Sequence, residues 1–312
     1  MVLKTATAPT LRRNGARIRK ALEVCNLAEH SQQLVRRSPP LRVLGLDVNT
    51  NSTGLAVVTE RGRVCRWGYI PTAQFASADV LHIGGVIDEF LSNVQAVEPK
   101  EVQWVVGIEA FMRMFRSGRF HNAGIFQLAQ LNGIVSFACW KRFNVLPLHT
   151  HPSAARGFFG LSAPTSTSAK NKKSSIKHQV MSFLEQQEPE LTRAANQDTD
   201  GSEALPGFER MRTGALADSA FDIADAYVIA AYTRCVHFQA QLQLQQPQLA
   251  EDFSRRYIEL THEAAAKKKR STEVEALENM EEKDKAAYTR DLFTFGVENW
   301  FKERNKCFML DN

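Results

Sequence analysis

The stretch Leu44-Gly45-Leu46-Asp47-Val48-Asn49-Thr50-Asn51-Ser52-Thr53-Gly54-Leu55-Ala56-Val57-Val58 predicts a β-hairpin that carries one acid in an unusual place. Apolar runs at 41–46 and 55–58 predict two strands, and the Asn, Ser, Thr and Gly residues between them favour a turn. Asp47 closes the first strand, where a carboxylate costs desolvation free energy unless a cation or hydrogen bonds compensate it. Two interpretations are open from this stretch alone: Asp47 caps the turn, or it is a metal ligand on the first strand of a sheet.

Charge is unevenly distributed along the 312 residues. Residues 100–180 carry 11 basic and 2 acidic side chains, whereas residues 181–312 carry 16 basic and 24 acidic ones. A basic block inside an otherwise apolar domain predicts a polyanionic partner. The five cysteines are scattered and include no Cys-x-x-Cys pair, which argues against a zinc site or a disulfide framework and for a reducing compartment. No apolar run reaches the length of a membrane span, so no membrane partner is expected.

The first 40 residues predict a separate basic N-terminal extension. Six basic residues precede the first acid, Glu23, and this arginine-rich, acid-poor composition is typical of a transit peptide for the mitochondrion or another organelle. A basic arm that binds nucleic acid phosphates is the alternative. A helix is expected over residues 21–35, ended by Ser38-Pro39-Pro40.

Periodicity predicts one domain of alternating strands and helices over residues 41–238, followed by a helical C-terminal extension over 239–312. Further strands are expected at 64–70, 102–108 and 144–149, and helices at 79–95, 123–143, 153–159, 174–187 and 215–232. A polar loop is expected over 160–175, and a flexible insertion over 188–214, where hydrophobic residues are few.

A second acid repeats the pattern of Asp47. Glu109 closes the buried strand that precedes it. In the last helix of the domain, Asp218, Asp222 and Asp225 are spaced i, i+4 and i+7, which places them on one helical face among apolar neighbours. Because like charges on a buried face repel each other, that face is expected to meet something positive, most simply a metal ion. Asp218 is left out of the ligand set, since it could instead complement the helix dipole.

Taken in order, these motifs resemble the RuvC-type Holliday-junction resolvases of the RNase H-like superfamily, including their phage and organellar relatives. The resemblance covers about residues 41–235. It rests on Leu44-Gly45-Leu46-Asp47 with Ser52-Thr53-Gly54, on Gly107-Ile108-Glu109, on Leu128-Ala129-Gln130-Leu131-Asn132-Gly133-Ile134-Val135, on Lys177-His178-Gln179-Val180 and on Asp222-Ile223-Ala224-Asp225-Ala226. The insertion and both terminal extensions have no counterpart in the short bacterial enzymes.

The resemblance implies an α/β, RNase H-like mixed sheet flanked by helices, and a crossover junction endodeoxyribonuclease that nicks four-way DNA junctions as a homodimer. Two Mg²⁺ ions per active site, with Mn²⁺ as an alternative, would support phosphodiester hydrolysis. The implied metal ligands and catalytic acids are Asp47, which would bridge the ions, with Glu109, Asp222 and Asp225. Lys177 or Lys173 would stabilise the charge of the scissile phosphate.

Basic and aromatic residues near these acids predict the nucleic acid contacts. Phenylalanines interleave with arginines after Glu109, and a lysine cluster precedes the helix that contains Lys177. The predicted phosphate-binding and stacking residues are Arg113, Arg116, Arg119, Lys170, Lys172, Lys173, Phe111 and Phe115. Ordinary core packing is the alternative for the two phenylalanines. The apolar face of the helix at 123–143 is the predicted dimer seam.

Two other function classes stay open. A RuvC-like fold kept as a nucleic-acid-binding or assembly factor in an organellar ribonucleoprotein would bind RNA or DNA without cleavage, although the presence of all four acids argues against such a loss. An actin-like sugar kinase or ATPase also begins with a Gly-x-Asp hairpin, but it needs a second glycine-rich phosphate-binding hairpin that this sequence lacks. A DNA junction and a structured RNA are alternative substrates.

Overall fold

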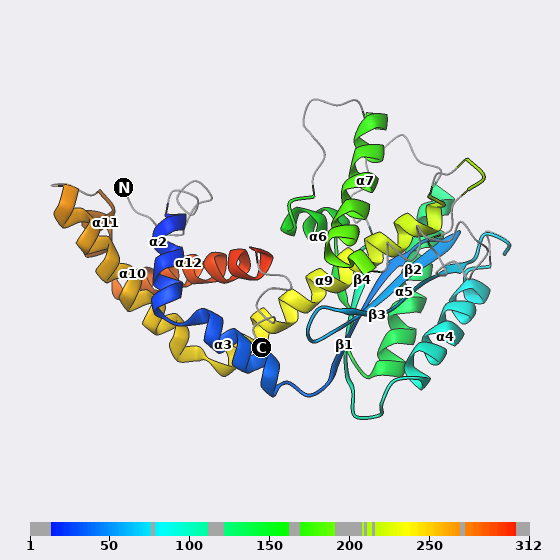
Figure 1. Cartoon of the computed structure of the whole chain (residues 1–312), viewed down its shortest axis with the longest axis horizontal. Coiled ribbons are helices and arrows are strands. Elements are labelled where there is room, and N and C mark those ends of the chain that lie inside the picture. The colour runs from blue at the N-terminus through cyan, green and yellow to red at the C-terminus, as the bar shows by residue number, and fades with distance from the viewer. Residues whose placement is uncertain are drawn as a thin grey trace. The chain divides into compact units, whose positions relative to one another are not determined.

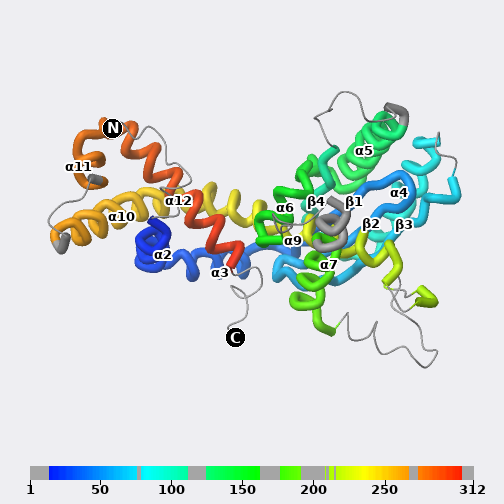
Figure 2. The backbone as a smooth tube through the Cα atoms, turned by 90° about the horizontal axis from the view of Figure 1, so that it is seen from above, coloured from blue at the N-terminus to red at the C-terminus, as the bar shows by residue number. Residues whose placement is uncertain are grey.

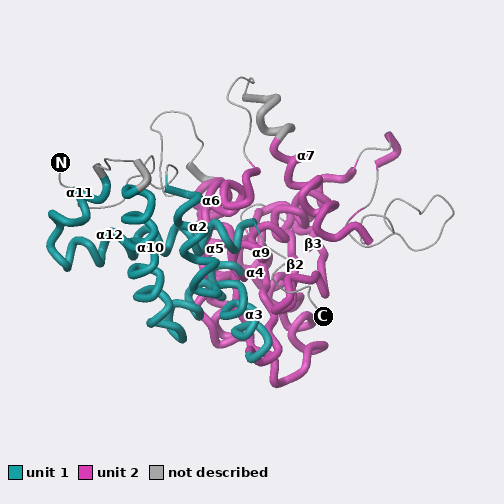
Figure 3. Tube along the Cα trace, turned by 60° about the vertical axis from the view of Figure 1, so that its left-hand side comes forward, with its two compact units in different colours: residues 1–37, 235–312 teal, residues 38–234 magenta. Residues whose placement is uncertain are grey.

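The computed structural model describes residues 14–75, 79–111, 122–161, 169–190, 208, 211–213, 216–268 and 272–303. It divides into two compact units (Figure 3): unit 1 comprises residues 1–37 and 235–312, and unit 2 comprises residues 38–234. The two ends of the chain, which were expected from the sequence to be separate extensions, belong to one unit. No helix in the described ranges is long and apolar enough to cross a membrane.

Unit 2 is built on a five-stranded sheet with the strand order β3-β2-β1-β4-β5 (Figure 1). The strands are β1 (Leu41–Val48), β2 (Ser52–Thr59), β3 (Val64–Pro71), β4 (Gln103–Glu109) and β5 (Leu148–Thr150). The first three form an antiparallel meander that contains the predicted hairpin, β4 runs parallel to β1, and β5 runs parallel to β4. This mixed sheet flanked by helices confirms the predicted α/β, RNase H-like fold class. The last strand is shorter than predicted.

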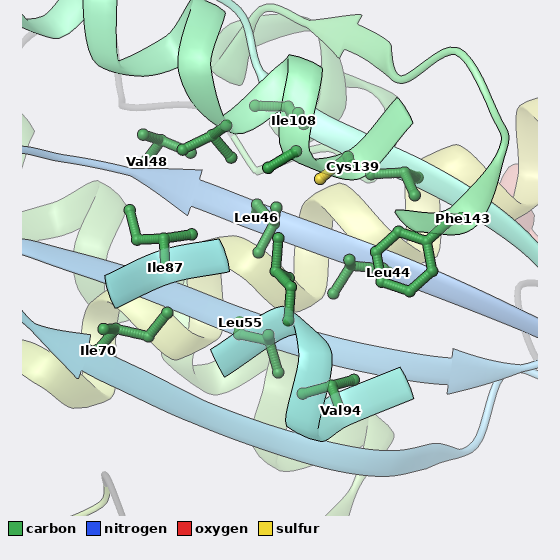
Figure 4. Close-up of a cluster of buried hydrophobic side chains, with 14 of the residues drawn as sticks. Leu44, Leu46, Val48, Leu55, Ile70, Ile87, Val94, Ile108, Cys139 and Phe143 are labelled. Atoms are coloured by element: carbon green, nitrogen blue, oxygen red, sulfur yellow. The ribbon is translucent and has the colours of Figure 1, made fainter. Parts of the chain in front are cut away.

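The main hydrophobic core lies between one face of the sheet and the helices α4 (Val80–Ala96) and α5 (Asn122–Phe143). Leu46 of β1, Ile87 of α4 and Cys139 of α5 are all fully buried in it (Figure 4). Successive side chains of a strand point to opposite faces, so the even-numbered leucines of β1 enter this core and the odd-numbered residues face the other way.

The opposite face of the sheet packs against α9 (Asp218–Gln245), whose backbone comes very close to the strands. A Cβ atom added to Gly45 of β1 would lie 2.5 Å from the backbone nitrogen of Ala230 and would also clash with the carbonyl oxygen of Ala226. A side chain at position 45 would therefore push the helix away from the sheet. Glycine is the residue that permits this approach of two backbones.

Two helices follow β5 in unit 2, namely α6 (Pro152–Phe158) and α7 (Ala169–Gln187). The polar loop predicted over residues 160–175 is wrong in its second half, because α7 begins at Ala169. Its first turns contain alanine and three lysines, which are good helix formers, and their polarity had suggested a loop. The predicted insertion at 188–214 falls mostly outside the described residues.

Unit 1 consists of helices, which can be followed in Figure 2. They are α2 (Gly15–Val24), α3 (Leu27–Arg37), α10 (Pro247–Lys268), α11 (Thr272–Glu278) and α12 (Glu282–Glu303), together with the end of α9. The prediction of a single helix over 21–35 is wrong, because the helical structure is interrupted between α2 and α3. Asn26 there adopts a left-handed backbone conformation with φ of 53°, which ends a helix and which asparagine tolerates.

A buried carboxylate ties the N-terminal helix of unit 1 to its C-terminal helices. Glu273 of α11 accepts hydrogen bonds from Asn14 Nδ2 at 2.8 Å, from Arg17 Nη1 at 2.8 Å and from the hydroxyl of Tyr257 at 2.7 Å. A buried carboxylate is costly unless it is paired and hydrogen-bonded, so this network stabilises the packing of α2 on α10 and α11. The segment from Asn14 onward is thus an integral part of unit 1.

The close approach of α9 predicts a large effect of one added methyl group. Gly45→Ala is expected to lower the free energy of unfolding by about 1–3 kcal/mol or more, because the new Cβ overlaps the α9 backbone. Gly85→Ala on the exposed side of α4 is the matched control; its Cβ would meet no neighbouring group within 4 Å, and alanine favours the helix by about 1 kcal/mol. Urea denaturation measures both, and equal stability of Gly45→Ala and wild type would contradict the packing described.

Candidate active site at the end of β1 and β4

The first two predicted acids lie on the face of the sheet that packs against α9. Asp47 follows Gly45 by two residues on β1, so its side chain is on the same face. Glu109 follows Gly107 by two residues on β4, and a Cβ at Gly107 would lie 3.1 Å from Ile229 of α9. Since Gly45 and Gly107 are register partners in the parallel pair, the two carboxylates leave neighbouring strand ends on one side of the sheet.

The two acids of α9 reach the same place because β2 also has a glycine at this level. Gly54 is the register partner of Asp47, and a Cβ there would clash with the carbonyl group of Asp222. The helix backbone at Asp222 therefore lies directly over the strand beside Asp47. Asp225 is three residues further along and shares that helical face. The structure thus brings together the four acids that the sequence singled out.

Asp47 is the most deeply buried of the four, with 4% of its surface exposed. Burial, a hydrogen bond to Glu109 and the negative charges of Glu109, Asp225 and Asp222 raise the pKa of the Asp47 carboxyl well above its ordinary value. In its neutral form Asp47 donates that hydrogen bond to Glu109. The turn-cap interpretation of Asp47 leaves this cost unexplained, whereas a cation bound here would offset it.

Asp222 and Asp225 each have a partner that offsets part of the free-energy cost of burying a charged carboxylate. Burial raises the pKa of Asp222, while a hydrogen bond from the hydroxyl of Ser52 and the charge of Lys177 act in the opposite direction. Burial likewise raises the pKa of Asp225, against the charge and hydrogen bonds of Arg156. Arg156 donates to Asp225 through Nε at 3.0 Å and pairs through Nη2 at 2.7 Å.

Asp218, the third acid of the α9 stripe, lies apart from the buried cluster. Its side chain is 90% exposed and forms an ion pair with Lys177 at 3.0 Å. The Lys177 ammonium also lies 4.9 Å from the ring centroid of Phe221. This places the predicted catalytic lysine beside the acids, where it is one of the charges that act on Asp222.

The predicted nucleic acid contacts are described only in part. Phe111 lies just after β4 and is half-buried. Three lysines are in the first turns of α7, where the backbone but not the side chains is described: Lys170, Lys172 and Lys173. The others lie outside the described residues: Arg113, Phe115, Arg116 and Arg119.

The four acids fit a divalent cation in chemistry but not in their present arrangement. Carboxylate oxygens are the ligands that Mg²⁺ prefers, and three further carboxylates surround the buried Asp47. Within the described ranges, however, no three Asp, Glu, His or Cys side chains gather into a group that could hold a metal ion. Ser52 donates a hydrogen bond to Asp222, and Arg156 donates one to Asp225. Release from these partners would free both acids to act as ligands.

Sequence reasoning missed Arg156, although the topology offered a signal for it. It is the basic residue of α6, the short helix that follows β5. Strand β5 is the parallel neighbour of β4, with Thr150 in register with Glu109. Because parallel strands end at one edge of a sheet, a cation placed just after β5 is close to an acid at the end of β4. The weak strand pattern at residues 148–150 hid that relation.

Comparisons with known proteins give no match in sequence and a distant likeness in structure. No family model matches the sequence, and no curated protein matches it. Solved structures that resemble it include Thermus thermophilus RuvC in complex with a Holliday junction substrate, with a TM-score of 0.36, and Thermus thermophilus RuvC, with a TM-score of 0.34. Each is 17% identical in sequence, and each match covers 64% of this chain and 96% of the other. Such low values carry no conclusion about activity.

The buried cluster predicts a pH-dependent stability of the metal-free protein. A carboxyl whose pKa is higher in the folded state than in the unfolded state, where it is about 3.9, destabilises the fold at neutral pH. The effect begins to decrease as the pH falls below the folded-state pKa, and it is gone below the unfolded-state pKa. Asp47→Asn removes the charge without changing the shape, so the variant should be more stable than wild type at about pH 7.

The advantage of Asp47→Asn should shrink as the pH is lowered toward about 4. Urea denaturation of both proteins in the presence of a chelator, at several pH values, measures the difference. A stability difference that does not change with pH would show that the pKa of Asp47 is not raised in the folded state.

Proposed function

We propose that unit 2 is a divalent-metal-dependent, structure-selective endonuclease that acts on branched DNA, with the four-way junction as its substrate. The convergence of Asp47, Glu109, Asp222 and Asp225 on one face of the sheet carries this proposal. These residues would hold two Mg²⁺ or Mn²⁺ ions, which activate water and stabilise the leaving oxygen when bound. Lys177 lies at the exposed side of the cluster, where its ammonium can stabilise a phosphate.

A cleavage assay on a synthetic four-way DNA junction tests this function. Wild type is expected to cleave the junction with Mg²⁺ or Mn²⁺ but not a linear duplex of the same sequence. Asp47→Asn and Glu109→Gln should each lower the rate by at least about 100-fold, because metal coordination contributes several kcal/mol to transition-state stabilisation. Both variants should still bind the junction, since their phosphate-binding side chains are unchanged.

One observation favours a second function, that of a nucleic-acid-binding or assembly factor of an organellar ribonucleoprotein without cleavage. Arg156 and Ser52 already form hydrogen bonds with two of the four acids. In this arrangement the described residues include no group of three Asp, Glu, His or Cys side chains that could hold a metal ion. Absence of cleavage by wild type, together with tight binding of a structured RNA, would support this function and contradict the first.

Homodimerisation is the second part of the proposal. The apolar face of α5 that was predicted as the dimer seam, which contains Cys139, is instead buried in the core of unit 2, so the seam is proposed on another face of the helix. Phe126, Phe137 and Trp140 of α5 are 58%, 60% and 47% exposed, and their spacing places them on one helical face with Gly133. The rings of Phe137 and Trp140 pack together with centroids 5.7 Å apart. An exposed apolar stripe of this kind is typical of an interaction surface.

The α5 stripe predicts how the dimer can be broken. Replacing Phe137 and Trp140 together with aspartate should shift the protein to a monomer in light scattering coupled to size-exclusion chromatography, because two charges would have to be buried in the seam. Leu146→Asp is the control, since Leu146 is 85% exposed and lies outside α5. A wild type that is monomeric at every concentration would contradict the proposed dimer.

Targeting to the mitochondrion or another organelle stays a prediction from the basic N-terminus. The network around Glu273 limits how such a signal could be processed. Because Asn14 and Arg17 both bond to that buried carboxylate, removal of a presequence that preserves unit 1 would have to end before Asn14.

A further inference from the structure

The guanidinium of Arg156 occupies both oxygens of Asp225. Its Nε donates to Oδ1 at 3.0 Å, and its Nη2 pairs with Oδ2 at 2.7 Å. The two side chains are 24% and 16% exposed, so the pair is largely shielded from water. Two parallel contacts of this kind are the strong, geometrically specific form of an ion pair. A carboxylate held in this way presents few free lone pairs to another cation.

Arg156 is held in place by the structure around it. Helix α6 follows β5 closely and is capped at its N-terminus by His151, whose side chain accepts a hydrogen bond from the backbone of Ser153. Ala155 is fully buried, and Phe158 packs edge-on against Tyr232 of α9 at 5.2 Å between ring centroids. The helix that carries Arg156 is thus anchored to the helix that carries Asp225 (both labelled in Figure 1). Because both helices are anchored, the fold itself holds the two side chains of the ion pair together.

The ion pair accounts for the disagreement between the chemistry of the acids and their arrangement. The four carboxylates have the composition of a metal site, yet in the part of the chain that is described they do not form one. Asp225 is turned to Arg156, and a divalent ion placed beside it would also face the charge of that guanidinium. Either the arginine or the metal ion can neutralise Asp225, but they repel each other.

We propose that Arg156 is an internal counter-ion that competes with divalent cations for Asp225, so that metal binding requires its displacement. Arg156 is in this sense a positioning residue that sets the metal affinity of the site. The inference rests on the metal site of the proposed function. It predicts that the wild-type protein binds divalent cations more weakly than its four carboxylates alone would allow.

Titration of the full-length protein with Mn²⁺, followed by the electron paramagnetic resonance signal of the free ion, tests the competition. Arg156→Gln should bind Mn²⁺ about tenfold more tightly than wild type, because a strong charge-assisted contact no longer has to be broken. Arg156→Lys keeps the charge but loses the two-pronged contact, so its affinity should fall between the two. Arg142→Gln is the matched control; it removes a similar two-contact pair with Asp88, between α5 and α4, and should bind like wild type.

Asp47→Asn distinguishes failure of the competition from failure of the metal site, since this variant should lose the Mn²⁺ site. Equal or weaker Mn²⁺ binding by Arg156→Gln, with binding still abolished by Asp47→Asn, would overturn the competition and leave the proposed metal site standing. Identical weak binding by wild type, Arg156→Gln and Asp47→Asn would overturn the metal site itself and the competition with it. Thermal unfolding establishes that each variant is folded, and Arg156→Lys keeps the test decisive if Arg156→Gln does not fold.

Discussion

Helix α9 and the central strands of unit 2 meet through backbone at positions where the strands have no side chain. Gly45 and Gly54 allow this contact, and at both positions a single added carbon would overlap the helix. The contact determines more than packing density. It places the first turns of α9 beside the ends of β1 and β4. For this reason Asp222 and Asp225 share a buried space with Asp47.

The same contact makes the site electrostatically expensive. Asp47, Asp222 and Asp225 all have raised pKa values, with burial as the leading cause in each case. Charged groups gathered without compensation lower stability, and they persist at positions where they serve a function. The protein offsets part of this cost with Ser52 and Arg156, and it leaves Asp47 with Glu109 as its hydrogen-bonding partner.

The sequence predicted the features that depend on local pattern. Strand alternation around Asp47, the buried run before Glu109 and the helical spacing of Asp222 and Asp225 all lie within short windows, and the fold class followed from their order. The partner of Asp225 could not be predicted in this way, because Arg156 comes to it through the placement of β5 beside β4. The break at Asn26 was missed because a left-handed residue interrupts the backbone and leaves the helical composition on both sides unchanged. The lysine-rich start of α7 was missed because polarity alone does not separate a loop from a helical turn.

The network at Glu273 also determines the order in which the protein can be completed during synthesis. Asn14 and Glu273 are 259 residues apart in the chain, and the bond between them closes nearly its whole length. Helix α2 leaves the ribosome first, but its buried partners on α10, α11 and α12 are made last. The residues of unit 2 are therefore complete before the helices that pack against α2 have been synthesised. During that interval Ile18 and Leu22 of α2 have no apolar partner from α12.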